Sequence, residues 1–302
     1  MTVSGVKELV IVSGKGGTGK TTVSGSFAHL SQGAVFCDCD VDAANLSLLL
    51  ENTVVETQEF GGGLKARIDA RKCDACGICE KSCRFHAIES LSIDPVFCEG
   101  CGLCQLLCPT RAIEMYPELS GHWYVSETAR GPLVHARLEP GGDNSGRLVT
   151  VVRNRARELC LSQGRHLVIT DGPPGIGCPV ISSLSGADLA LLVTEPTLSG
   201  IHDLKRVMEV CRRLNVRTTV CINKYDVDLD NTERIRAIAG QTSPVVGLIP
   251  YDQAVPRAMD EGVPVVTFKS PAATALVNLW TRVREELHRE GAPSRRAHSK
   301  GR

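Results

Sequence analysis

The chain has 302 residues, enough for one large domain or two ordinary ones with a sizeable buried core. Lysine plus arginine (34) equals aspartate plus glutamate (34), so charge alone gives no support for nucleic-acid or anionic-membrane binding. No apolar run is long enough to span a membrane, and the N-terminus lacks the apolar core of a secretion signal. We therefore expect a cytoplasmic protein, in which 14 cysteines favour metal binding over disulfides.

The first predicted elements surround a glycine-rich loop. Apolar residues 9–12 predict a strand and residues 21–31 a helix, and the segment between them fits the phosphate-binding pattern G-x-x-x-x-G-K-[ST]. In such a loop, backbone amides and the helix N-terminus hold phosphates, Lys20 pairs with the β and γ phosphates, and Thr21 ligates Mg²⁺. The predicted nucleotide-binding residues are Gly14, Lys15, Gly16, Gly17, Thr18, Gly19, Lys20, Thr21 and Thr22.

A second buried strand is predicted at residues 34–37, ending at Asp38-Cys39-Asp40, and residues 43–50 predict a short helix. From about residue 54 the composition changes, and up to about residue 117 the chain is rich in cysteine and glycine with little periodicity. This stretch contains an internal repeat whose two units begin 25 residues apart.

Eight cysteines form two quartets in this repeat, each with the C-x2-C-x2-C-x3-C spacing of four-iron clusters. In two-cluster ferredoxins the fourth cysteine of each run ligates the other cluster. The alternative is zinc, although structural zinc sites usually pair two CxxC units at longer separation. We therefore expect one [4Fe-4S] cluster on Cys73, Cys76, Cys79 and Cys108, and another on Cys98, Cys101, Cys104 and Cys83.

The rest of the chain alternates strands with helices. One or two strands are predicted within residues 121–138 and a helix at 146–163, followed by strands at 166–170, 188–193, 218–222 and 245–249 and helices at 203–214 and 272–287. Apolar strands alternating with helices indicate an α/β fold, a mostly parallel sheet with helices on both faces. Basic residues 291–302 predict a disordered tail.

The loop carries a second lysine, Lys15, and thereby resembles the deviant phosphate loop of the MinD, ParA, Mrp and nitrogenase iron-protein family. That resemblance implies an ATP-dependent homodimer in which Lys15 reaches the partner's nucleotide; the alternative is a solvated loop charge. It also implies that Asp40, in the first switch, positions the attacking water. In the second switch, residues 171–175, Asp171 would hold Mg²⁺ and Gly175 would sense the γ-phosphate.

The sequence specifies the base of the bound nucleotide less clearly. The segment Asn223-Lys224-Tyr225-Asp226 fits N-K-x-D, which reads guanine in GTPases, but an asparagine at this strand end also reads adenine in the MinD-like family. Because the Lys15 loop favours ATP, we predict ATP rather than GTP, with Asn223 and Pro250 beside the base.

Cys178 lies seven residues after Asp171, as does a cluster-ligating cysteine in the similar nitrogenase iron protein. This spacing suggests a cluster bridging two subunits. That role needs a second cysteine per subunit, however, and we identify none outside the quartets, so a spare thiol is the alternative.

The chain thus resembles MinD/Mrp-type ATPases that carry an inserted ferredoxin domain. The predicted division is a P-loop ATPase domain (residues 1–56 and 119–290), a 2[4Fe-4S] insert (57–118) and the tail (291–302). We predict an ATP-hydrolysing iron–sulfur protein that couples dimer switching to electron transfer with a redox partner whose identity the sequence leaves open. One alternative is an Mrp-type cluster carrier, which the lack of a CxxC outside the insert disfavours. A further alternative is a MinD/ParA-like spatial organiser.

Overall fold

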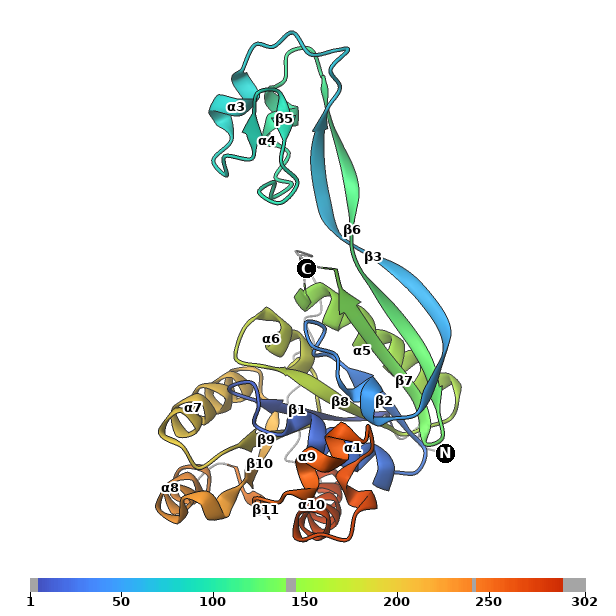
Figure 1. Ribbon diagram of the computed structural model, residues 1–302, viewed down its shortest axis with the longest axis vertical. Helices are drawn as coiled ribbons and strands as arrows, with labels where there is room; N and C mark the ends of the chain where they lie inside the picture. Colours follow the sequence, from blue (N-terminus) through green and yellow to red (C-terminus); the bar gives the residue numbers. More distant parts are fainter. Residues whose placement is uncertain (1–4, 140–144, 241–242, 290–302) are drawn as a thin grey trace, which may run out of the picture.

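The computed structural model describes residues 5–139, 145–240 and 243–289. Its body is a sheet with helices on both faces, and a two-stranded ribbon carries a small head away from one edge (Figure 1). The strands are β1 (Lys7–Ser13), β2 (Ala34–Asp38), β3 (Asn52–Ile68), β4 (Ile88–Glu89), β5 (Ser92–Ile93), β6 (Ile113–Thr128), β7 (Gly131–Leu138), β8 (Leu167–Pro174), β9 (Leu189–Thr194), β10 (Arg217–Asn223) and β11 (Val245–Ile249).

Helices follow most strands of the body. They are α1 (Lys20–Leu30), α2 (Leu46–Leu49), α5 (Ser145–Ser162), α6 (Cys178–Leu184), α7 (Leu198–Arg213), α8 (Leu229–Ala239), α9 (Ala254–Asp260) and α10 (Pro271–His288), and the small head contains α3 (Ile78–Ser82) and α4 (Leu103–Leu107). The start of α10 shows how local sequence sets a boundary. The Ser270 side chain accepts the amide of Ala273, and Pro271 occupies the first turn, where its missing N–H costs nothing.

The nine strands of the main sheet have the order β11-β10-β9-β1-β8-β2-β7-β6-β3. From β11 to β7 the strands run parallel, whereas β7, β6 and β3 pair antiparallel. Along β1, Leu9 and Ile11 pack with α1 and α10, and Val10 and Val12 pack with α6 and α7 on the other face. Both faces are therefore buried, and the predicted α/β fold with a mostly parallel sheet is confirmed.

The ribbon is formed by β3 and β6, which pair from Asn52 opposite Thr128 to Ile68 opposite Ile113. Its outer end carries the head, which we define as residues 69–112. The sequence shows little periodicity between about residues 54 and 117 and predicted no strand there, so β3 and the first part of β6 are elements that the sequence pattern did not indicate. Most β3 side chains are exposed, and a strand exposed on both faces shows no alternation of apolar and polar residues.

Other predicted boundaries shift for local reasons. The helix predicted at 43–50 is only Leu46–Leu49, and the one predicted at 203–214 begins at Leu198, because Thr197 caps it by accepting the amide of Gly200. The predicted tail, 291–302, lies outside the described residues. Within the described part of the chain, every helix is too short or too polar to cross a membrane.

Candidate functional site

The phosphate-binding loop joins β1 to α1 at the carboxyl end of the parallel strands. Close contacts require its glycines: a Cβ on Gly14 would lie 2.4 Å from the Cβ of Asp203 on α7. Gly19 has a φ of 94°, and a Cβ there would lie 2.4 Å from Nδ2 of Asn223. That Nδ2 donates to the carbonyl of Thr18 at 2.9 Å. The loop is thus held between α7 and the end of β10, in the strand–loop–helix context that the motif requires.

Two buried aspartates lie side by side next to the loop. Asp38, at the end of β2, is the register partner of Asp171 in β8. Oδ1 of Asp171 accepts the hydroxyl of Ser24 at 2.8 Å. Burial raises the pKa of Asp171 to about 6, although the Lys20 charge opposes the shift. Burial and the Asp171 charge raise the pKa of Asp38 well above its usual range. Such a carboxylate pair beside a cation suits a divalent metal and phosphates.

The first switch is shaped by Asp38, a residue that our sequence prediction passed over in favour of Asp40. The two carboxylate oxygens of Asp38 accept the amides of Asp40 at 3.1 Å and Leu46 at 3.0 Å. Asp40 is half-buried, and burial raises its pKa while the nearby Lys20 charge lowers it. The structure therefore brings Asp40 to the phosphate end of the site, and its role with water stays a prediction.

Lys15 is held within its own subunit. Its Nζ lies 3.6 Å from Oε2 of Glu195 and 3.3 Å from Oγ of Ser199. The other oxygen of Glu195 accepts Nζ of Lys224 at 2.7 Å, and the glutamate side chain is only 13% exposed. Neither of the two roles predicted for Lys15, a contact with the partner subunit's nucleotide or a solvated loop charge, included Glu195. Sequence reasoning missed Glu195, whose only signal is its place directly after a buried strand.

Residues predicted to hold the base meet beside the loop. Asn223 reaches the loop carbonyl, and Oδ1 of Asp226 accepts the amide of Tyr251 at 2.7 Å. This bond ties the end of β10 to the end of β11, where Pro250 lies. One carboxylate oxygen of the N-K-x-D segment is thus engaged by the backbone. The choice of adenine over guanine stays a prediction.

The second switch folds back onto β1. Gly175 has a φ of 94°, and its amide donates to the carbonyl of Ser13 at 2.8 Å. Three residues later Cys178 begins α6 with an exposed side chain. A Cβ on Gly146, in the first turn of α5, would lie 3.2 Å from the Cβ of Cys178. The position of Cys178 neither requires nor contradicts a bridging cluster, and its ligand role stays a prediction.

The eight quartet cysteines line two hollows in the head. Each hollow combines three cysteines of one run with the fourth cysteine of the other, and the remaining lining is mainly apolar. One is lined by Cys73, Cys76, Cys79 and Cys108, and the other by Cys83, Cys98, Cys101 and Cys104. Crossed ligation would group the same cysteines, and the assignment of these cysteines as cluster ligands stays a prediction. Among the described residues, no group of three or more His, Cys, Asp or Glu side chains forms a site for a metal ion.

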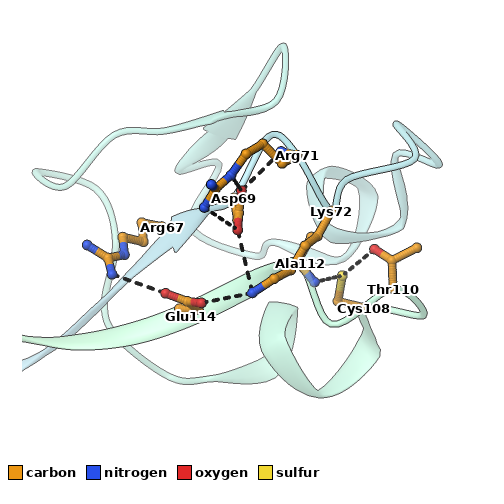
Figure 2. A network of polar contacts seen from close by, with 8 residues as sticks. All are labelled: Arg67, Asp69, Arg71, Lys72, Cys108, Thr110, Ala112 and Glu114. Atoms are coloured by element: carbon orange, nitrogen blue, oxygen red, sulfur yellow. Dashed lines mark hydrogen bonds and ion pairs between the residues drawn. The ribbon is translucent and has the colours of Figure 1, made fainter.

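A polar network surrounds Cys108 (Figure 2). Its Sγ accepts the amide of Ala112 at 3.2 Å and lies 3.6 Å from the hydroxyl of Thr110. Burial alone would raise the pKa of the Cys108 thiol, but these hydrogen bonds lower it. An ion pair of 3.2 Å between Glu114 and Lys72 joins β6 to the loop that enters the first quartet. The hydrogen bonds from Thr110 and Ala112 favour the thiolate, the form of cysteine that ligates metals.

Comparisons with known proteins agree on one family. The model of the CobQ/CobB/MinD/ParA nucleotide binding domain matches residues 9–265. An uncharacterized protein of Methanocaldococcus jannaschii is 34% identical over 292 residues, which cover 93% of this chain and 97% of the relative. The septum site-determining protein MinD of Bacillus subtilis is 24% identical over 291 residues, covering 91% and 88% of the two chains.

Solved structures share the fold. The septum site-determining protein MinD of Pyrococcus horikoshii, complexed with Mg-ADP, has a TM-score of 0.59 at 19% identity and covers 94% of this chain and 98% of its own. The cell division protein MinD of Aquifex aeolicus has a TM-score of 0.56 at 22% identity, covering 96% and 100%. The relatives named here by role are division-site proteins. The comparisons therefore agree better with the spatial-organiser alternative than with electron transfer, and they lend no support to an inserted ferredoxin domain.

Proposed function

The chain belongs to the CobQ/CobB/MinD/ParA nucleotide-binding family and is an ATPase of the MinD/ParA type, and from that premise we propose that its ATP cycle controls electron transfer through the head. The cycle would use ATP with Mg²⁺ and a homodimer. The head, residues 69–112 within the proposed insert 57–118, would hold two [4Fe-4S] clusters that exchange electrons with a redox partner.

The main support for nucleotide and Mg²⁺ binding is one buried carboxylate oxygen. Oδ2 of Asp171 is buried and makes no hydrogen bond within the described residues, although its neighbour Oδ1 does. A buried carboxylate oxygen without a partner is costly, and a Mg²⁺ ion held by Asp171 and Thr21 would satisfy it. Lys20 and the loop amides then bind the phosphates, and Asp40 orients the attacking water. A buried Lys20 beside these carboxylates fits this assignment.

Lys15 would complete the site of the partner subunit. In the single chain its ammonium rests on Glu195 and Ser199, at the edge of the nucleotide site. Dimer formation would exchange the glutamate for the partner's nucleotide phosphates. The exchange replaces a partly buried ion pair with a charge-assisted contact to phosphate. A dimer is therefore favoured only when ATP is bound.

The two hollows support the cluster half of the proposal. Each presents four cysteines in an apolar lining, and Cys108 is stabilised as thiolate by two hydrogen bonds. When bound, a [4Fe-4S] cluster supplies one-electron transfer at a potential set by hydrogen bonds, charge and solvent exposure. Cys76 and Cys101 are exposed, which leaves one corner of each proposed cluster open to a partner protein.

Paired cysteine variants test the clusters and their crossed ligation. Cys83 and Cys98 line the same hollow. The Cys83→Ser and Cys98→Ser variants should therefore each lose the iron of one cluster after anaerobic reconstitution, and the double variant should lose no more. Cys73→Ser combined with Cys98→Ser should lose the iron of both clusters. Equal iron in the two double variants would contradict crossed ligation, and absence of bound iron from the wild-type protein would contradict the clusters.

Coupling to ATP needs its own measurement. The reconstituted protein should show cluster potentials, or rates of reduction by a low-potential donor, that differ between ATP, ADP and no nucleotide. Asp171→Asn, which should not hold Mg²⁺, is the matched control. Identical potentials and rates in the three nucleotide states would refute ATP-controlled electron transfer while leaving the ATPase intact.

The second candidate is a spatial organiser, which the likeness to septum site-determining proteins favours. It predicts ATP-dependent binding to a surface. Co-sedimentation with vesicles containing phosphatidylglycerol, and separately with plasmid DNA, should then increase with ATP over ADP. Surface binding together with nucleotide-insensitive clusters would select the organiser over electron transfer.

A further inference from the structure

The ribbon leaves the body at one defined point. Strand β7 supports β6 only from Gly121 to Thr128, so beyond Gly121 the ribbon is two strands wide. Phe60, opposite Gly121, is 5% exposed and belongs to the apolar cluster beneath α5. Phe60 is therefore the last ribbon side chain in that cluster, and the strands beyond it lead away from the body (Figure 1).

Glycines and two register shifts follow Phe60 at once. The pairing moves from Phe60–Gly121 to Gly61–Leu119 and then to Gly63–Glu118, so one residue is left out of register in each strand. Such bulges interrupt the ladder and bend the strands, and Gly61-Gly62-Gly63 adds backbone freedom that other residues lack. The ribbon changes direction between its lower and upper halves (Figure 1).

The same point touches the helix that packs on the second switch. Arg147, in the first turn of α5, lies with its guanidinium carbon 5.8 Å from the Phe60 ring centroid, and Nη1 donates to the carbonyl of Gly61 at 3.5 Å. One residue earlier, Gly146 lies against Cys178, the first residue of α6. Only two residues separate Cys178 from Gly175 in the second switch.

We propose that Gly61–Gly63 is a hinge between body and head, and that Gly146 and Arg147 transmit the state of the second switch to it. The inference rests on the proposed nucleotide switch and names its mechanical output. Because Gly146 has no side chain, the first turn of α5 packs directly against the start of α6. When α6 moves with the second switch, that turn of α5 moves with it. Arg147 then shifts against Phe60 and Gly61, and the head changes its angle to the body. The coupling passes through contacting elements rather than over a distance.

Other surfaces of the molecule give weaker support for a proposal. The hollow lined by Lys7, His166, Trp280, Arg284 and His288 lies at the opposite end of the parallel strands, where basic side chains are expected beside helix C-termini. Val96, Phe97 and Leu106 of the head are exposed apolar side chains, and nothing in the structure specifies what would cover them. The hinge, in contrast, is defined by pairing, packing and two contacts at one place.

Hydrogen–deuterium exchange of the full-length protein tests the hinge. Peptides covering residues 57–64 and 117–122 should change their exchange rates between no nucleotide, Mg-ADP and a non-hydrolysable ATP analogue with Mg²⁺. Arg147→Ala should abolish that response while peptides of the phosphate loop keep theirs. The expected difference is about two- to fivefold in exchange rate, the equilibrium factor that one exposed cation–π contact supplies.

Two further variants complete the design. Arg212→Ala removes an exposed arginine of α7 that pairs only with Glu209 among the described residues, and should leave the hinge response at its wild-type size. Gly61→Ala fits sterically, because a Cβ there would lie 3.7 Å from its nearest neighbour, and should reduce the response by removing the backbone freedom of glycine.

The outcomes separate the hinge from the proposed function. Loop peptides that respond to nucleotide while hinge peptides do not would overturn the hinge alone. A full wild-type response in Arg147→Ala would overturn the transmission through α5. Loop peptides that ignore nucleotide would overturn the proposed switch, and the hinge with it.

Discussion

Replacing Arg153 by methionine should destabilise the body strongly, because this arginine neutralises a buried carboxylate. Its Nε donates to Oε1 of Glu8 at 2.7 Å, and the two side chains are 7% and 0% exposed. The same guanidinium also donates to the carbonyls of Ser182 and Ser185, at the end of α6. Removing one member of a buried pair leaves the other charge uncompensated and costs about 3–5 kcal/mol.

The structure favours the lower end of that range. Arg157 also lies 3.4 Å from Glu8, but its side chain is 41% exposed, so water screens its charge and it compensates only in part. Methionine keeps the apolar volume of the arginine stem, so little cavity cost is added. We therefore expect a loss of about 3 kcal/mol in the free energy of unfolding.

Urea unfolding followed by circular dichroism at 222 nm measures this loss, with Glu8→Gln combined with Arg153→Met as the control. The double variant buries no unpaired charge and should recover more than half of the stability. A loss below about 1 kcal/mol in the single variant, the range of exposed ion pairs, would refute the reasoning. So would a double variant less stable than the single one.

Three further predictions concern the fold and the site. Burial lowers the pKa of His135 to about 4, below its unfolded value, so the fold should lose up to about 3 kcal/mol as the pH falls from 6.5 towards 4. Denaturation at several pH values checks this, and His135→Gln should flatten that part of the profile. Glu195→Gln should release Lys15 and strengthen ATP-dependent dimerisation by about two- to fivefold, measured by analytical ultracentrifugation; weaker dimerisation would count against it. Gly14→Ala places a Cβ 2.4 Å from that of Asp203 and should abolish ATP binding in calorimetry, so a Kd within about threefold of wild-type would contradict it.

Much of the site could be predicted because its signals are local. A phosphate loop is a run of adjacent residues whose backbone does the binding, so Gly14 to Thr21 were found directly and lie where expected. Asp40 and Asp171 were found because their segments resemble the two switches of the family; Asp40 follows β2, whereas Asp171 lies within β8. Glu195 and Asp38 were missed as functional residues, since their roles depend on partners distant in the chain or on amides that only the folded loop presents.

The sequence by itself determined the α/β body, the nucleotide loop and the two cysteine runs, because apolar periodicity, glycine spacing and cysteine spacing are properties of neighbouring residues. Only the tertiary structure decided that the head is carried away from the body on a two-stranded ribbon. It also brought Phe60 of the ribbon to Arg147 of α5, beside the second switch. Contacts between distant segments depend on how the chain packs, and an exposed ribbon buries too little apolar surface to leave a pattern in its sequence.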